Sequence, residues 1–172
     1  MARGTREALP ALVGMEDGDR ATRFRAVCVA VESGLRRTLV AAYGPDLGSD
    51  AAADALAWAW EHFDRVETMD NPAGYLWRVG QTSVRRAAGR RHRWHAPDAA
   101  TAGGEPAYEP GLAQALAGLS ERQRAAVLLV HGYGYPLVEA AGLLGCRIRT
   151  LRNHLDRGLA KIRLTLGVTV DA

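Results

Sequence analysis

The chain has 172 residues, enough for one ordinary domain or two small ones. Hydrophobic residues make up 48% of the sequence and charged residues 24%, which is typical of a globular protein and excludes a fibrous or fully disordered one. No apolar run approaches the roughly 18 residues that a membrane-spanning helix needs. Residues 1–20 lack the uninterrupted apolar core of a signal peptide. We therefore expect a cytoplasmic protein without membrane insertion.

The net charge is only +3, but the charges are segregated along the sequence. Residues 44–74 hold seven acids and one Arg, whereas residues 85–95 hold five Arg and no acid. Residues 147–163 hold six basic residues against one Asp. Basic blocks favour local contact with a polyanion, and the acidic block is left for a different partner.

Helical spacing dominates the first half of the chain. Apolar residues recur every three or four positions over residues 24–42, and Gly44-Pro45 ends that segment. A second helix is expected over about 49–63, which is rich in Ala and Trp. The turn at 70–72 precedes a third helix, which begins near Ala73 and runs into the Arg block. Its inward residues are predicted to be Tyr75, Leu76, Val79 and Ser83.

A segment with the composition of a linker divides the chain. Residues 96–110 hold three Pro and two Gly and show no apolar periodicity. No stretch alternates with the period of a β-strand, so we expect an all-α fold of two small helical domains joined by a flexible linker. The predicted divisions are a flexible tail at 1–20, a first domain at 21–95, the linker at 96–111, a second domain at 112–167 and a tail at 168–172.

The second domain carries the signals of a helix-turn-helix. Ser120 followed by Gln123 fits a capping box that opens a helix. A short helix over 136–144 is followed by Gly145, a typical left-handed helix end. The second helix of such a motif fits the major groove of DNA. The last helix of the chain has an apolar stripe at Ile148, Leu151, Leu155, Leu159 and Ile162.

The other side of that last helix is basic. At 100° per residue, Arg149, Asn153 and Arg157 fall opposite Leu151, with Arg152 at the boundary. Arg can read guanine, Asn can read adenine, and either can bind phosphate. An amphipathic helix with a solvated basic face would show the same pattern. The order of short helix, glycine and basic helix favours DNA binding.

Two further surfaces are candidates. The Arg block at 85–95 can bind phosphates, and Tyr75, Trp77 and Trp94 offer rings for the bases of an opened strand; a solvated helix end with rings in the core is the alternative. Carboxylates recur every four residues in the second helix, where they favour a protein partner over DNA, against the alternative of a solvated acidic face. These carboxylates belong to Asp46, Asp50 and Asp54.

No pattern of an enzyme is present. The sequence lacks HExxH, CxxC, GxxxxGK[ST] and GxSxG, so we expect no catalytic residues, no metal site and no cofactor. Cys28 and Cys146 lie far apart in the sequence, at positions that suit a small apolar residue on a helix face. Both are predicted to be buried free thiols.

These segments resemble the bacterial sigma factors, and their short two-domain layout is similar to the extracytoplasmic-function group. Residues 119–130, Glu139–Gly145 and Thr150–Leu159 resemble the promoter-binding C-terminal domain. Residues 50–60 resemble the helix that docks on RNA polymerase, and residues 71–79, Asn-Pro-Ala-Gly-Tyr-Leu-Trp-Arg-Val, resemble the start of the helix that opens promoter DNA. The resemblance implies a protein that binds core RNA polymerase and directs it to promoter DNA.

The resemblance also implies roles for single residues. Asp50 and Asp54 would contact the clamp helices of the largest polymerase subunit, and the loop 65–71 would hold a base flipped out of the melted promoter. The linker permits an anti-sigma protein as a further partner. The implied contacts are Tyr75, Arg78, Arg85 and Arg86 with the opened strand, and Arg147, Arg149, Arg152, Asn153 and Arg157 with the distal promoter element.

Several positions depart from the family pattern. Ala53 replaces a usual Gln in the polymerase-docking helix, while Thr82 and Arg86 replace an Asn and an acidic residue in the strand-opening helix. Pro136-Leu137-Val138 replaces Ser-Tyr-Glu at the start of the helix-turn-helix, and His154 replaces a common Arg. These changes keep the DNA-binding frame and bear on promoter melting and polymerase affinity.

Two other functions fit part of the sequence. A stand-alone helix-turn-helix regulator would bind duplex DNA without polymerase, but it has no need for an acidic helix followed by an aromatic and Arg-rich one. The other function is that of a protein-interaction module that has lost DNA binding. The intact basic residues Arg149, Arg152, Asn153 and Arg157 speak against it.

Overall fold

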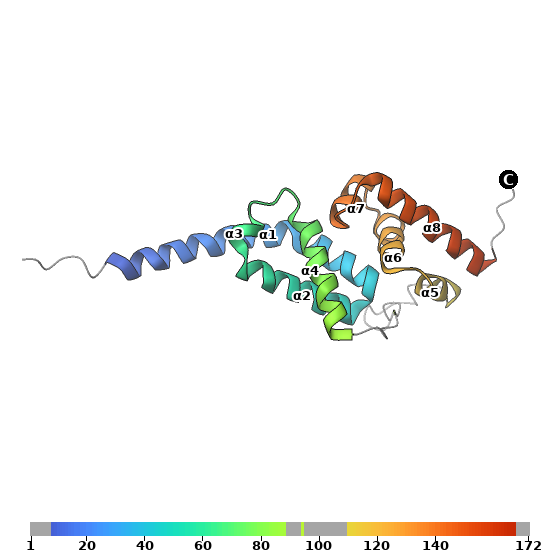
Figure 1. Cartoon of the computed structure of the whole chain (residues 1–172), viewed down its shortest axis with the longest axis horizontal. Coiled ribbons are helices and arrows are strands. Elements are labelled where there is room, and N and C mark those ends of the chain that lie inside the picture. Colours follow the sequence, from blue (N-terminus) through green and yellow to red (C-terminus); the bar gives the residue numbers. More distant parts are fainter. Residues whose placement is uncertain (1–7, 89–93, 95–109, 168–172) are drawn as a thin grey trace, which may run out of the picture.

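The computed structural model describes residues 8–88, 94 and 110–167, and within these ranges it contains helices and turns without a strand (Figure 1). The predicted all-α class is confirmed. The elements are α1 (Ala8–Tyr43), α2 (Pro45–Glu61), α3 (Phe63–Val66), α4 (Pro72–Ala88), α5 (Pro110–Ala117), α6 (Glu121–Val127), a π-helical turn η3 (Leu128–Gly132), α7 (Leu137–Leu143) and α8 (Ile148–Leu166).

The N-terminal domain is built on three helices that contact one another, α1, α2 and α4. The core contains large apolar side chains of α1 and α4, which pack against a row of alanines on α2. Because alanine side chains are short, the helix backbones approach closely. The buried residues include Leu35 and Leu39 of α1, Ala51, Ala52, Ala55 and Ala59 of α2, and Leu76 and Trp77 of α4.

Helix boundaries differ from the sequence prediction at two places. Helix α1 begins at Ala8 and takes in most of the segment predicted as a flexible tail. Pro10 does not prevent this, because the N–H groups of a first helical turn have no intrahelical partner. Helix α2 begins at Pro45, since proline suits the first helical position and Gly44 adopts a φ of 88° before it.

In the C-terminal domain α8 packs across α5, α6 and α7. The predicted capping box is present: the Gln123 N–H donates to the Ser120 hydroxyl, and the Gln123 side chain accepts from the Ser120 N–H. Gly145 adopts the predicted left-handed conformation, with a φ of 57°. Leu151, Leu155 and Ile162 are buried as predicted. Ile148 of the predicted stripe is 36% exposed, because it is the first residue of α8 and lies at the end of the packed region.

The two domains pack against each other along a boundary that we call the domain seam (Figure 1). Helix α1 contacts α6 and α7, and α4 contacts α7. The Tyr43 hydroxyl of α1 donates to Glu121 of α6 at 2.7 Å, and Arg37 donates to the Tyr135 hydroxyl at 2.9 Å. No helix of the described residues is long and apolar enough to cross a membrane.

Candidate nucleic-acid interface

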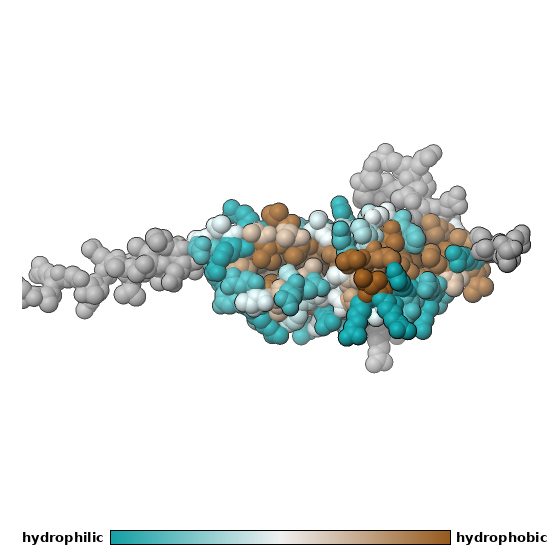
Figure 2. Space-filling view, turned by 90° about the horizontal axis from the view of Figure 1, so that it is seen from above, coloured by the Kyte–Doolittle hydropathy of each residue, from teal (hydrophilic) through white to brown (hydrophobic). Residues whose placement is uncertain are grey.

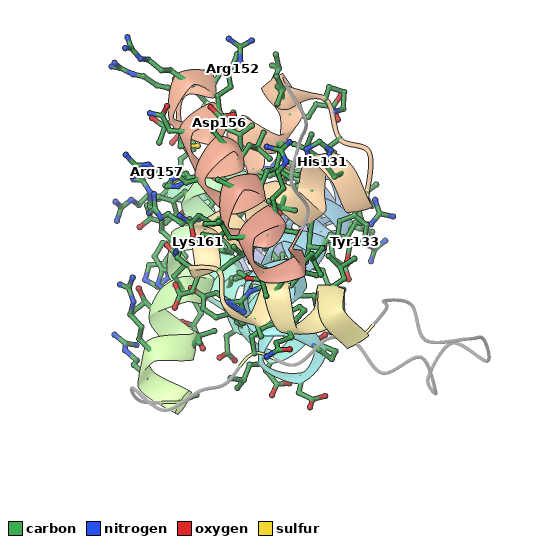
Figure 3. The ribbon with its side chains drawn as sticks, turned by 90° about the vertical axis from the view of Figure 1, so that its right-hand side faces the viewer. His131, Tyr133, Arg152, Asp156, Arg157 and Lys161 are labelled. Carbon is green, nitrogen blue, oxygen red and sulfur yellow. The ribbon has the colours of Figure 1, made fainter. Side chains whose placement is uncertain are left out.

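The polar face of α8 is exposed from the first turn of the helix. Leu151 and Leu155 anchor the opposite face in the core, and this turns the polar side chains outward. Figure 3 shows Arg152, Asp156, Arg157 and Lys161 following one another along α8, with His131 and Tyr133 on the other side of the helix. Among the described residues, no arginine of this face forms an ion pair. The predicted DNA contacts Arg147, Arg149, Arg152, Asn153 and Arg157 are all exposed.

His154 lies beside this face and is partly buried. Burial lowers its pKa, and the nearby cations Arg122 and Arg157 lower it further. The imidazole is therefore neutral near pH 7 and adds no positive charge where the family commonly has an Arg.

Two exposed apolar side chains lie in the first turns of α7 and α8. Val138 of α7 is 67% exposed and Ile148 of α8 is 36% exposed. Figure 2 shows apolar and strongly hydrophilic surfaces side by side on the upper face of the C-terminal domain. Apolar side chains can contact thymine methyl groups in the major groove. The apolar Val138 at a position where the family usually has Glu was the sequence signal for this patch.

The predicted strand contacts of α4 do not share one environment. Arg78, Arg85 and Arg86 are exposed, but they lie on different cavities. Tyr75 is half-buried, with its ring 5.4 Å from that of Trp58 and the Arg65 guanidinium 5.3 Å from its centroid. Tyr75, Trp58 and Arg86 line a groove of about 720 Å³ between α2 and α4, which offers aromatic and basic groups together.

The prediction that Trp77 and Trp94 could stack on bases is not supported by the structure. Trp77 is fully buried in the core of the N-terminal domain. Trp94 is 7% exposed, and the Arg124 guanidinium lies 4.8 Å above its ring. Both rings are buried, whereas a ring that stacks on a base has to be exposed to the solvent. Apart from Trp94, the part of the Arg block beyond Ala88 lies outside the described residues.

The carboxylates of α2 share an exposed face, because the helix begins early enough to include Asp46. Asp50 is exposed and accepts no hydrogen bond from a side chain of the described residues. Asp54 differs, because its carboxylate accepts a hydrogen bond from Ser83 of α4. Asp54 thus joins α2 to α4, and Asp50 is the freer of the two predicted polymerase contacts.

The loop before α4 contacts the helix-turn-helix directly. The Asn71 side chain accepts from the Gly74 N–H and donates to the Gly142 carbonyl, both at 2.9 Å. Arg78 donates to the Gly145 carbonyl at 3.3 Å. A Cβ on Gly74 would lie 2.8 Å from the Gly145 Cα, so only glycine permits this approach. Sequence reasoning did not find these contacts.

Cys28 and Cys146 are free, as predicted, but half-buried. Burial raises the pKa of both thiols, so neither is an activated nucleophile near pH 7. The described residues contain no group of three or more His, Cys, Asp or Glu side chains that could hold a metal ion.

Comparison with known proteins identifies the C-terminal domain. Residues 111–162, which include the predicted helix-turn-helix, match the family model "Sigma-70, region 4". The whole fold is similar to the sigma factor RpoE from Bartonella quintana, solved in complex with the anti-sigma factor NepR. The TM-score is 0.59 at 23% identity, covering 86% of this chain and 98% of that chain. No curated protein matches the chain. The predicted resemblance to sigma factors is confirmed in the C-terminal domain and in the fold.

Proposed function

We propose that this chain is a sigma factor of the extracytoplasmic-function type, which binds core RNA polymerase and directs it to promoters. The observation that carries the proposal is a region 4 helix-turn-helix with a free basic face. The domain joined to it carries an exposed acidic helix face and a groove lined by Tyr75, Trp58 and Arg86 together with the carboxylates Asp54 and Glu61. The role is non-enzymatic and is exercised in the cytoplasm, where the polymerase works.

We assign promoter-duplex binding to the exposed face of α8. Its first turns supply Arg149 and Asn153, which reach base edges in the geometry of a helix-turn-helix. Arg147, Arg152 and Arg157 lie around them and are positioned for phosphates. Val138 adds an apolar contact at the edge of the groove.

We assign polymerase docking to the acidic face of α2, with Asp50 as its main contact and Asp54 as a contact already shared with Ser83.

The opened strand is assigned to α4, with Tyr75 and Arg86 in the groove and Arg78 and Arg85 beside it. Because Arg78 and Asn71 are bound across the domain seam, full release of these two side chains for the strand requires the domains to separate. By analogy with the NepR complex, an anti-sigma protein is the partner that would regulate this separation.

A stand-alone regulator of duplex DNA is the second candidate. It is favoured by the exposed basic face of α8, since Arg78 of α4 already donates a hydrogen bond to the other domain. The two functions differ in their need for polymerase. Asp50→Arg should weaken binding to core polymerase by at least tenfold while leaving duplex DNA binding by the chain unchanged. Asp64→Arg makes the same charge change on α3, where the side chain is 89% exposed, and is the matched control.

Co-elution with core polymerase and fluorescence anisotropy with duplex DNA measure the two affinities separately. A chain that binds DNA but never co-elutes with polymerase would make the stand-alone regulator the correct function. Equal loss of both affinities in Asp50→Arg would show that polymerase and DNA are not divided between the domains.

A further inference from the structure

A cavity of about 850 Å³ lies on the domain seam beside Trp94. Its walls come from both domains, since α4 supplies Arg85, α6 supplies Arg122 and Arg124, and α8 supplies His154. A volume of this size is typical of small-molecule sites. Of these four residues, the proposed sigma function uses only Arg85.

Among the described residues, the cavity wall holds three arginines and one carboxylate. In the described part of the chain, Arg85, Arg122 and Arg124 form no ion pair. The one carboxylate on its wall, Glu121, accepts a hydrogen bond from the Tyr43 hydroxyl at 2.7 Å. Three guanidinium groups therefore face one carboxylate that already has a partner, and closing the domains brings these like charges together.

The deepest basic group, Arg124, is only 5% exposed. It donates to the Leu119 carbonyl at 2.9 Å and covers the Trp94 ring, and its burial lowers its pKa to about 10. The Glu121 carboxylate raises this pKa, but it also accepts the hydrogen bond of the Tyr43 hydroxyl. The Nε of Arg124 and the Nε1 of Trp94 are both buried donors without a hydrogen-bond partner. Both residues line the cavity, so two donors of its wall lack an acceptor.

We propose that the cavity binds a phosphate group held between the two domains, with Arg85 and Arg122 as its exposed ligands and Arg124 behind them. Guanidinium groups bind phosphate oxygens in pairs, and a phosphate carries three acceptor oxygens and nearly two negative charges. It therefore satisfies donors from both sides of the seam at once. The phosphate belongs either to a small phosphorylated molecule or to a nucleic-acid strand.

The site is tested by calorimetric titration of the full chain with inorganic pyrophosphate. The double variant Arg85→Gln/Arg122→Gln should weaken binding by at least tenfold. The control Arg25→Gln/Arg163→Gln removes the same charge from exposed positions of α1 and α8 off the cavity, and should change the affinity by less than twofold. No binding by the intact chain, or equal weakening in both variants, would show an adventitious ion only and overturn the proposal.

The two native cysteines report whether the ligand bridges the domains. Cys28 lies on α1 and Cys146 precedes α8, so spin labels on them measure a distance across the seam. Pyrophosphate should narrow the distance distribution in the intact chain and leave that of Arg85→Gln/Arg122→Gln unchanged. An unchanged distribution in the intact chain would contradict a bridging phosphate.

Competition identifies the source of the phosphate. A short single-stranded DNA that displaces pyrophosphate assigns the site to a nucleic-acid strand, whereas pyrophosphate binding unaffected by that DNA assigns it to a small phosphorylated molecule. Neither measurement involves polymerase, so the site and the proposed sigma function can fail independently.

Discussion

The arginines of α8 and those of α4 are the same residue type, but they have different surroundings. On α8, Arg149 and Arg152 project from a helix whose apolar side is fixed in the core. On α4, Arg78 donates to the backbone of the helix-turn-helix, and Arg85 borders the cavity on the seam. The first set forms no ion pair among the described residues, whereas Arg78 is exposed but already donates one hydrogen bond across the seam.

This difference shows that a basic block in a sequence does not define its own role. Both helices carry at least three exposed arginines, and the contact of α4 with the other domain distinguishes the two sets.

Replacing Leu151, the fully buried residue of α8, should weaken the packing that positions the exposed arginines of this helix. Leu151→Ala creates a cavity in the C-terminal core and should lower the free energy of unfolding by about 3 kcal/mol. Leu164→Ala on the same helix changes a side chain that is 84% exposed and should cost less than about 0.5 kcal/mol. Denaturant titration followed by circular dichroism measures both, and equal losses would place α8 outside the core.

Removing two arginines from the free face should reduce duplex DNA affinity about 100-fold, since each base or phosphate contact of this kind is worth about 1–3 kcal/mol. The variant is Arg149→Ala/Arg152→Ala, measured by anisotropy as a function of salt, and its log–log salt slope should become shallower. Arg163→Ala, near the far end of α8, is the control and should change the affinity less than threefold. An unchanged affinity in the double variant would mean that α8 does not bind DNA.

Adding one methyl group at the seam should separate the domains. A Cβ on Gly74 would lie 2.8 Å from Gly142 O and from Gly145 Cα, whereas a Cβ on Gly142 meets nothing within 4 Å. Gly74→Ala should therefore broaden and lengthen the Cys28–Cys146 label distance and increase affinity for single-stranded DNA severalfold. Gly142→Ala should leave both unchanged. A closed distance in Gly74→Ala would show that the seam does not occlude α4.

The smallest effect concerns His154. Its pKa is lowered by burial and then by Arg122 and Arg157, so an NMR titration should place it below 6.5, and Arg122→Gln should raise it. The unfolded chain binds this proton more readily, so the contribution of His154 to stability is lost as pH falls below about 6.5. A pKa unaffected by Arg122→Gln would mean that the two side chains are further apart than the structure places them.

Local features of this fold could be predicted from the sequence because they depend on neighbouring residues. The capping box at Ser120 and the left-handed Gly145 are set within a few positions. The burial of Trp94 and the contact between Asp54 and Ser83 could not be predicted. They depend on side chains about 30 positions apart that meet only in the folded chain.

In the candidate site, too, local patterns could be predicted and contacts between distant segments could not. Helical periodicity predicted the polar face with Arg149, Asn153 and Arg157, and these residues are exposed, whereas Arg147 came from the family resemblance and precedes α8. The engagement of Asn71 and Arg78 with the other domain joins residues 71 and 67 positions apart, and no local pattern encodes it.

Run-off transcription with purified core polymerase and genomic promoter fragments tests whether this chain acts as a sigma factor. Addition of the chain should give a transcript with a defined start, and both Asp50→Arg and Arg149→Ala/Arg152→Ala should abolish it, the first by loss of polymerase and the second by loss of promoter binding. The absence of a chain-dependent transcript, together with failure to co-elute with polymerase, would contradict the assignment of this protein as a sigma factor.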